Sequence, residues 1–126
     1  MNSGFLLIVP AAAAALLALS GCSTFSNTKP SMTTEEIMEE GFKGKTSMAA
    51  RLGENTASNA DKMRMVYLTE QLELNAPPKG SHASWEEKTA SLNRAAIALA
   101  DNLPASLESW RAAADCKACH SVHKPD

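Results

Sequence analysis

The sequence predicts an all-α protein whose helices form an antiparallel four-helix bundle. Three observations favour this fold class. No stretch alternates apolar and polar residues for long enough to form a β-strand. Two patterns, Thr-x-x-Glu and Ser-x-x-Glu, have the form of a helix capping box, and prolines stand where the helical patterns end. The connections between the predicted helices are short, which favours antiparallel neighbours.

The first helix is predicted over residues 33–53. Thr33 and Glu36 form the capping box that opens it, and the acidic residues of its first turn suit the positive end of the helix dipole. Gly41 and Gly44 are expected to loosen its middle, because glycine loses more backbone entropy in a helix than alanine does. The prediction is one helix with a weak centre.

The second helix is predicted to begin at Ser58 or Asn59 and to run to about Leu74. Pro77 and Pro78 follow, and neither continues a helix. Apolar side chains at helical spacing predict that this helix has one apolar face. The residues of that face are Met63, Val66, Tyr67 and Leu74.

The third helix is predicted to open at a second capping box, Ser84 with Glu87, and to end near Pro104. Its buried face is predicted to consist of Trp85, Leu92, Ala96 and Leu99. The fourth helix is predicted to begin between Pro104 and Ser106 and to carry a cluster of cysteines and histidines before Pro125. Its apolar positions are Leu107, Trp110 and Ala114.

The chain begins with an apolar run, residues 5–19, that is too short for a permanent membrane helix and has the length of a signal-peptide core. The run ends in the sequence LSGC, whose cysteine is Cys22. LSGC resembles the lipobox of bacterial lipoproteins, in which the cysteine receives the lipid. The resemblance implies a lipoprotein signal peptide over residues 1–21 and a lipidated Cys22, although the first residues, MNSG, carry no lysine or arginine. An ordinary secretory signal with an incidental cysteine is the alternative.

Residues 22–32, CSTFSNTKPSM, are small and polar with no helical period, and they predict a flexible tether. Extended at about 3.5 Å per residue, the tether would hold the domain of residues 33–126 roughly 35–40 Å from the membrane surface. The prediction is a protein of the bacterial cell envelope, anchored by lipid and facing the periplasm. Ser23 stands where an aspartate favours the inner membrane, so the likeness to lipoproteins favours the outer membrane.

The charge and the cysteine count exclude some classes of function. The formal net charge of −2 leaves no electrostatic basis for nucleic-acid binding. No cluster of serine, cysteine and carboxylate residues in the sequence points to an enzyme. The chain has three cysteines, and an odd number in an exported protein leaves one thiol to explain. Lipidation of Cys22 would leave Cys116 and Cys119 as a pair.

The C-terminal sequence DCKACHSVHKPD carries the residues that point most directly to a chemistry. On a helix, Cys116 lies about 300° from Cys119 and about 40° from His120, so all three share one face. Cys-x-x-Cys-His is the attachment signal for c-type haem, in which two thiols bind the vinyl groups and the histidine binds the iron. Haem of this type is attached outside the bacterial cytoplasm, which agrees with the export signal.

Two other kinds of site use the same residues. A redox-active thiol pair also has the Cys-x-x-Cys spacing, but the βαβ pattern around such pairs is lacking in this sequence. A structural zinc site could use both cysteines with His120 and His123, but four ligands on one helical face do not easily surround a tetrahedral ion. His123 is expected instead at the surface or near a haem propionate, because it follows His120 by three residues on the same side.

The motif and its place near the C-terminus resemble the small class II c-type cytochromes, a family of four-helix bundles with the haem attached on the last helix. The matched motif is CKACH at residues 116–120. PPKG at 77–80, SWEEKT at 84–89 and the terminal CHSVHK also resemble small bacterial members. The resemblance implies one covalent haem c (heme c) per chain, bound by the two cysteines and by His120 as the proximal ligand. Bundles of this kind often form homodimers.

The resemblance also implies a distal iron ligand on the first helix, where family members with six-coordinate iron carry a methionine. Met38 stands at the corresponding place, and Met48 is the next choice. Most helical methionines fill space in a core, so a packing role for Met38 is the alternative. Relatives often carry a histidine where this chain has Phe42, which argues against a histidine ligand from this helix. His82 is expected to be exposed in the loop between the second and third helices.

Together these residues predict a membrane-anchored one-electron carrier that meets redox partner proteins. Ligation by Met38 and His120 would fill the coordination sphere and raise the reduction potential relative to two histidines. If Met38 only packs, a five-coordinate iron would bind nitric oxide or carbon monoxide, as in cytochrome c prime. A haem-free structural lipoprotein with a disulfide between Cys116 and Cys119 is the third hypothesis.

Overall fold

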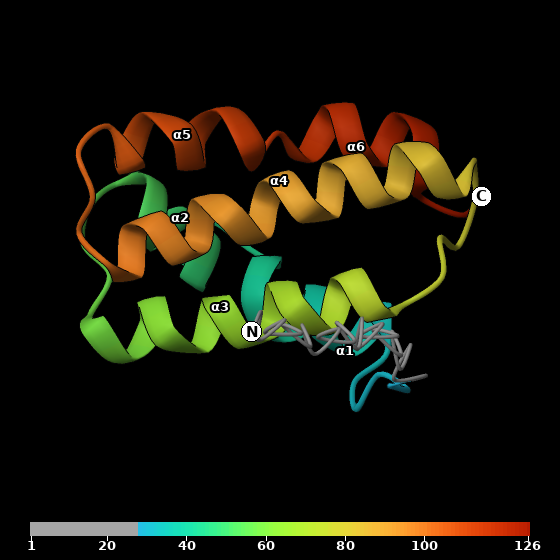
Figure 1. Ribbon diagram of the computed structural model, residues 1–126, viewed down its shortest axis with the longest axis horizontal. Coiled ribbons are helices and arrows are strands. Elements are labelled where there is room, and N and C mark those ends of the chain that lie inside the picture. The colour runs from blue at the N-terminus through green and yellow to red at the C-terminus, as the bar shows by residue number, and fades with distance from the viewer. Residues whose placement is uncertain (1–27) are drawn as a thin grey trace, which may run out of the picture.

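The structure, a computed structural model, describes residues 28–126, and this range consists of helices and loops with no β-strand (Figure 1). The all-α prediction is therefore confirmed. The predicted signal peptide, residues 1–21, and the predicted lipid anchor, Cys22, lie outside the described residues. No helix in residues 28–126 combines the length and the apolarity needed to cross a bilayer.

Seven helical elements follow one another along the described chain. They are α1 (Thr34–Ile37), the π-helix η1 (Met38–Phe42), α2 (Met48–Gly53), α3 (Asn59–Leu74), α4 (His82–Ala100), α5 (Ser106–Ala113) and α6 (Cys116–His123). The two long helices, α3 and α4, pack against each other. α1 and α2 pack on α3, and α5 packs on α4 and α2. α5 and α6 follow one line beside α4 in Figure 1.

The prediction of one continuous first helix is wrong, because the structure divides it into α1, η1 and α2. The capping box at its start is confirmed: Glu36 N donates to Thr33 Oγ1 over 3.2 Å, and Thr33 N donates to Glu36 Oε2 over 2.7 Å. The chain leaves the helix after Phe42 and turns at Gly44, whose φ of 96° favours glycine. α2 then begins with Ser47 as a new N-cap.

The prediction for α3 is right about its ends and right about half of its apolar face, because Val66 and Tyr67 pack against the hydrophobic core whereas Met63 and Leu74 do not. Ser58 is the N-cap and forms a capping box with Asp61. Met63 is 62% exposed and Leu74 is 40% exposed. The apolar residues that α3 buries are Met65, Leu68 and Leu72. Polar Thr69 lies on the buried face too, where its hydroxyl donates to a backbone carbonyl of its own helix, so hydrophobicity alone does not mark this face.

α4 begins earlier than predicted and buries the predicted face. Its N-cap is Ser81, whose hydroxyl accepts from Ser84 N over 3.2 Å, so the predicted capping box of Ser84 and Glu87 is wrong. Gly80 is the reason, because its φ of 82° turns the chain into the helix directly before Ser81. The residues predicted for the buried face are confirmed as buried: Trp85, Leu92, Ala96 and Leu99.

The predicted fourth helix is two helices that separate at Ala114 and Asp115. Asp115 is the N-cap of α6, and its carboxylate accepts from Ala118 N over 3.0 Å. A new N-cap inside a helical pattern ends one ladder of hydrogen bonds and begins another.

Two apolar positions predicted for this segment contribute to the core. Trp110 is 1% exposed, and Leu107 packs against the core from its edge.

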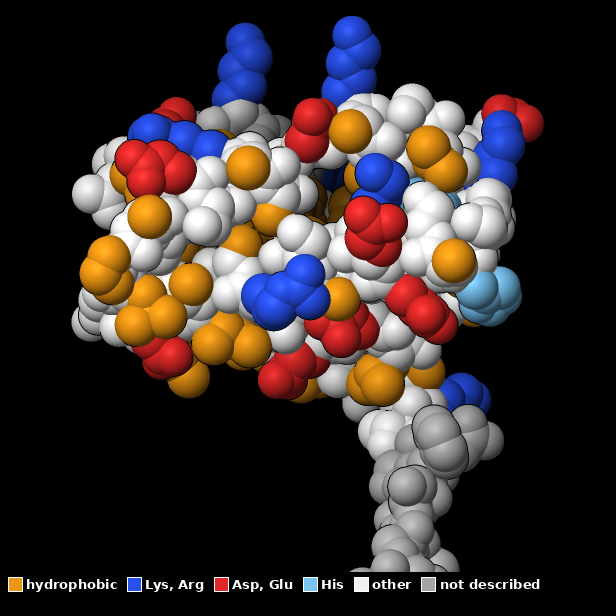
Figure 2. All heavy atoms as spheres, turned by 45° about the horizontal axis from the view of Figure 1, so that its top comes forward, with side chains coloured by type: hydrophobic (Ala, Val, Ile, Leu, Met, Phe, Trp, Pro, Cys, Tyr) orange, Lys and Arg blue, Asp and Glu red, His pale blue; other side chains and the backbone are white. Residues whose placement is uncertain are grey.

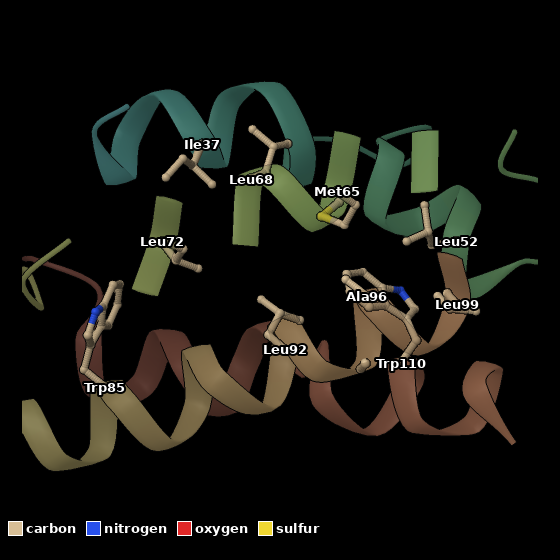
Figure 3. Packing of buried hydrophobic residues seen from close by; sticks show 11 residues of the cluster. Ile37, Leu52, Met65, Leu68, Leu72, Trp85, Leu92, Ala96, Leu99 and Trp110 are labelled. Atoms are coloured by element: carbon tan, nitrogen blue, oxygen red, sulfur yellow. The ribbon is translucent and has the colours of Figure 1, made fainter. Parts of the chain in front are cut away.

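The hydrophobic core lies between two groups of helices (Figure 3). In that view, the side chains of α1, α2 and α3 point toward those of α4 and α5, with Trp85 at one end and Leu52 and Leu99 at the other. Both indoles are hydrogen-bonded: Trp85 Nε1 donates to Asn75 O over 2.7 Å, and Trp110 Nε1 donates to Ala49 O over 3.2 Å. These bonds tie the loop after α3 to α4, and α2 to α5.

The molecular surface carries charges of both signs. Figure 2 shows lysine and arginine side chains interspersed with aspartate and glutamate over one face of the molecule. Arg64 of α3, for example, forms an ion pair with Glu40 of η1, and the same guanidinium lies 4.9 Å from the centre of the Tyr67 ring. Interspersed charges of this kind are typical of a solvated surface.

Gly41→Ala is expected to destabilise the fold by roughly 1–3 kcal/mol. Gly41 lies in η1 against α3, and an added Cβ would come within 2.8 Å of Leu68 Cδ1 in the filled core. Gly53→Ala is the control: nothing lies within 4 Å of its added Cβ, and it is expected to stabilise the fold by about 0.4–1 kcal/mol. Chemical denaturation measures both variants, and equal stabilities would contradict the close approach of η1 and α3.

Candidate functional site

A cavity of about 790 Å³ lies between the beginning of the helical domain and its C-terminal end. One wall comes from α1 and η1, and another comes from α6 and the residues on either side of it. Apolar side chains of α3 and α4 complete the lining: Leu72, Trp85 and Leu92. Sites for small molecules and cofactors measure about 300–1,000 Å³ and combine apolar walls with a few polar groups. The cavity therefore has the size and the chemistry of a cofactor site.

α6 contributes two thiols and an imidazole to this cavity. Cys116, Cys119 and His120 all line it, which agrees with the shared face expected from helical spacing. Asp115 caps the helix directly before Cys116, so all three side chains lie in the first two turns of α6. Both cysteines are free thiols in this structure.

η1 contributes a thioether and an aromatic ring to the same cavity. Met38 and Phe42 both line it, and both are half-buried against the hydrophobic core. π-helical turns are rare and often occur at functional sites. Met48, the next choice for a distal ligand, is not part of the described lining and packs against the core from α2. Of the two methionines, Met38 is thus the one that shares a cavity with His120.

The two thiols have different surroundings. Cys116 is exposed, and its Sγ lies 3.7 Å from the Ala114 carbonyl oxygen. Cys119 is half-buried, and this burial raises the pKa of its thiol, while the positive charge of Lys88 acts in the opposite direction. The thiolate is the form that attacks disulfides and binds zinc, and a raised pKa makes it scarcer. Cys119 therefore has the surroundings of an unreactive thiol.

Charged side chains stand at the edge of the cavity beside η1. Glu39 and Lys43 both line it and form an ion pair, with Lys43 Nζ 2.7 Å from Glu39 Oε1. The hydrogen bond from Lys43, and then its positive charge, lower the pKa of Glu39. Both side chains are largely exposed, so the pair contributes little to stability and is screened by salt.

His123 is buried and lines the cavity. The predicted position at the surface is therefore wrong, whereas the predicted contact with a haem propionate stays a prediction. The His123 side chain is 2% exposed. Nδ1 lies 2.7 Å from the Lys79 carbonyl oxygen, and Nε2 lies 3.1 Å from Ser84 Oγ. The physical reason is the turn at Gly80, which brings the loop before α4 against the imidazole. With both nitrogens bonded, His123 is not free to complete a zinc site with the cysteines and His120.

His82 is exposed as predicted, although it is the first residue of α4 rather than a loop residue.

The sequence analysis did not predict the contributions of Trp85 and Ser84 to the site. Trp85 was predicted only for the core, but it also lines the cavity and meets the His123 ring edge-on. Ser84 was predicted as a helix cap and instead bonds His123. The signal in the sequence was Gly80, since a glycine before a helix often marks a close backbone approach.

No protein-family model, no curated protein and no solved structure matches this chain. The function of the site has to follow from its own residues. These are two thiols and an imidazole on one wall of a cavity, and a thioether on another.

In the cofactor-free chain, iodoacetamide is expected to alkylate Cys116 faster than Cys119. Cys116 is exposed, whereas burial covers Cys119 and raises the pKa of its thiol. Trypsin cleaves after Lys117, so the two thiols fall on separate peptides whose alkylation is timed by mass spectrometry. The denatured chain is the control, in which the two rates should converge. Equal rates in the folded chain would contradict the placement of Cys119.

Proposed function

We propose that this protein is an exported c-type cytochrome that carries one electron at a time and is held at the membrane by a lipid on Cys22. The observation that carries the proposal is the cavity, which is lined by all three residues of the Cys-x-x-Cys-His motif and, from a different element, by Met38. A five-residue motif can occur by chance on an exposed helix. A motif that faces a cavity of cofactor size, with a second iron-binding side chain in that cavity, is far less expected.

The residues around the cavity fit a covalently attached haem. Cys116 and Cys119 have the spacing at which two thiols bind two vinyl groups, and His120 follows as the proximal iron ligand. The cavity volume of about 790 Å³ is within the range for cofactors. A bound haem supplies a reversible one-electron change between ferric and ferrous iron. Water would be kept from the site by the apolar side chains of Leu72, Trp85 and Leu92.

The helices support an arrangement as a four-helix bundle. α3 and α4 would be two of its members, α1 with η1 and α2 would be the third, and α5 continued by α6 would be the fourth. The turn at Gly44 and the cap at Asp115 would then be interruptions within two members. In this arrangement the motif lies on the last member, as in the class II cytochromes that the sequence resembles.

Met38 is the proposed distal ligand. It reaches the cavity from η1, whereas His120 reaches it from α6. Iron held by a methionine and a histidine would have a higher reduction potential than iron held by two histidines. Phe42, on the same wall as Met38, would exclude water on the distal side. A filled coordination sphere suits electron transfer because it leaves no open position for another ligand.

The predicted tether would allow the domain to form transient complexes with redox partner proteins. Ser31 and Met32 already belong to the folded domain, since Ser31 N donates to Gln71 Oε1 over 2.6 Å and Asn75 Nδ2 donates to the Met32 carbonyl over 2.8 Å. The predicted tether would therefore be shorter than residues 22–32 and would reach less far than the roughly 35–40 Å of the whole extended segment. A domain on such a tether can visit donor and acceptor proteins through small, weak interfaces.

The full chain, expressed with the bacterial cytochrome maturation machinery, is expected to carry haem that survives a denaturing gel and stains there. Replacing Cys116 and Cys119 together by alanine should abolish the stain, because no thioether can form. Cys22→Ala is the control: it should keep the haem and lose the lipid. A wild-type chain without covalent haem would end the proposal and leave the haem-free lipoprotein with a Cys116–Cys119 disulfide as the remaining hypothesis.

A five-coordinate binder of nitric oxide or carbon monoxide is the second candidate. The observation in its favour is that Met38 packs against the hydrophobic core together with Phe42, as a space-filling methionine would. In that case the two side chains would shape an open distal pocket. The two functions differ in one measurable property, namely whether Met38 binds the iron.

Met38→Ala is expected to abolish the far-red absorption band of a methionine–iron bond and to convert the iron to high spin, because one axial ligand is lost. Met63→Ala is the matched control, since Met63 is exposed on α3 and should leave the spectrum unchanged. Visible spectra with and without carbon monoxide measure both variants. If Met38→Ala leaves the spectrum unchanged and the wild-type protein already binds carbon monoxide, the gas-binding function replaces the electron carrier.

A further inference from the structure

We infer that His123 is a positioning residue: its buried imidazole fixes α6 to the beginning of α4, so that Cys116, Cys119 and His120 face the cavity before any cofactor is attached. That this arrangement serves the attachment of a cofactor rests on the proposed function. The arrangement itself rests on burial and on hydrogen bonds between side chains of this chain. His123 is not a proposed iron ligand, because both of its ring nitrogens are hydrogen-bonded within the chain.

α6 is not closely packed against any one of the other described helices. Among the elements of residues 28–126, the closely packed pairs involve α1, η1, α2, α3, α4 and α5, but not α6. His123 is the one buried residue of α6. The ion pair between Lys79 and Asp126, just beyond the end of α6, is exposed and therefore contributes little. Eight residues do not form a stable helix alone, so the place of α6 depends on contacts with the rest of the fold, and His123 supplies the one buried side chain among them.

Both ring nitrogens of His123 have defined roles. The Lys79 carbonyl can only accept, so Nδ1 carries the proton and donates to this oxygen over 2.7 Å. In the neutral ring, Nε2 is then an acceptor, and the Ser84 hydroxyl donates to it over 3.1 Å. Two bonds at opposite edges of the ring fix both its tautomer and its orientation.

The surface that receives the ring is itself held in place. Gly80 brings the loop so close that an added Cβ would lie 2.9 Å from His123 Nδ1 and 3.0 Å from the Val122 carbonyl oxygen. Trp85 meets the imidazole edge-on, with ring centroids 5.3 Å apart and an angle of 77° between the planes. The Trp85 indole is fixed in turn by its bond to the Asn75 carbonyl. The imidazole thus lies between a close backbone turn, a hydroxyl and an anchored indole.

One fixed side chain sets the direction of a whole helical face. His123 follows His120 by three residues and Cys119 by four, so the three side chains lie on neighbouring parts of α6. A displacement of His123 would therefore turn Cys119 and His120 away from the cavity together. A hydrogen-bonded contact is well suited to this task because it weakens steeply outside a narrow range of distance and angle.

The test compares variants of the full chain expressed without haem. His123→Phe keeps an aromatic ring beside Trp85 and loses both hydrogen bonds. His123→Asn retains an amide N–H near the position of Nδ1 and should restore part of what His123→Phe loses. Ser84→Ala removes the bond to Nε2 alone. His82→Phe is the matched control, because it makes the same substitution at an exposed residue of α4.

The measurement is the alkylation rate of Cys119 relative to that of Cys116, each on its own tryptic peptide. His123→Phe is expected to raise this ratio by about tenfold and Ser84→Ala by about threefold, because each hydrogen bond lost favours the detached helix. His82→Phe should change the ratio by less than about twofold, as surface substitutions usually do. In proton NMR, the wild-type chain should show a slowly exchanging imidazole N–H that His123→Phe lacks.

An unchanged ratio in a folded His123→Phe variant would overturn the inference, as would an imidazole N–H that exchanges freely in the wild-type chain. If His123→Phe does not fold, the ratio in Ser84→Ala decides. A wild-type chain that is unfolded without haem would also overturn the inference, but it would leave the cytochrome function standing. Conversely, a chain that shows the protected imidazole N–H and never acquires covalent haem would contradict the proposed function. It would leave the positioning role of His123 intact.

Discussion

The packing of α3 against α4 determines where the other elements of the domain lie. In the middle of this contact, Asn93 Nδ2 donates to Thr69 Oγ1 over 2.9 Å, and both side chains are buried. A buried polar pair favours one register of two helices, because a slip of either helix would leave the buried Asn93 amide without its partners on α3. α1 rests on α3, and α5 rests on α4. The packed helices α3 and α4 therefore also set the separation between the two walls of the cavity, α1 with η1 on one side and α6 on the other.

Local chemistry in the sequence was enough to predict some helices and not others. The ends of α3 follow from a capping residue at Ser58 and from the prolines after Leu74, all within a few residues of the boundary. Its buried face was not predictable in this way, because Thr69 lies on it and is satisfied by Asn93 from another helix. The break at Asp115 depends on a single N-cap, whose contribution is typically about 1 kcal/mol. A hydrophobic pattern with helical period gives no sign of an effect of that size, because it reports only which positions are apolar.

In the candidate site, too, some features could be predicted from the sequence and others could not. Helical spacing was enough to put both cysteines and His120 on one face, because these residues belong to a single turn-and-a-half of chain. The meeting of Met38 with that face is a long-range property, which the sequence reached only through its resemblance to a family. The burial of His123 depends on a carbonyl and a hydroxyl far earlier in the chain, at Lys79 and Ser84, and no periodic pattern relates them.

The break between α5 and α6 separates the C-terminal segment from the helices that form most of the core. α6 has eight residues and buries a single side chain, whereas α3 and α4 supply most of the core. Opening such a segment costs less free energy than unfolding the whole domain. On the proposed function, a maturation enzyme would have to reach both thiols; Cys116 is already exposed, and release of α6 would uncover Cys119 as well. The hydrophobic core, which α3 and α4 mostly supply, would stay closed during that step.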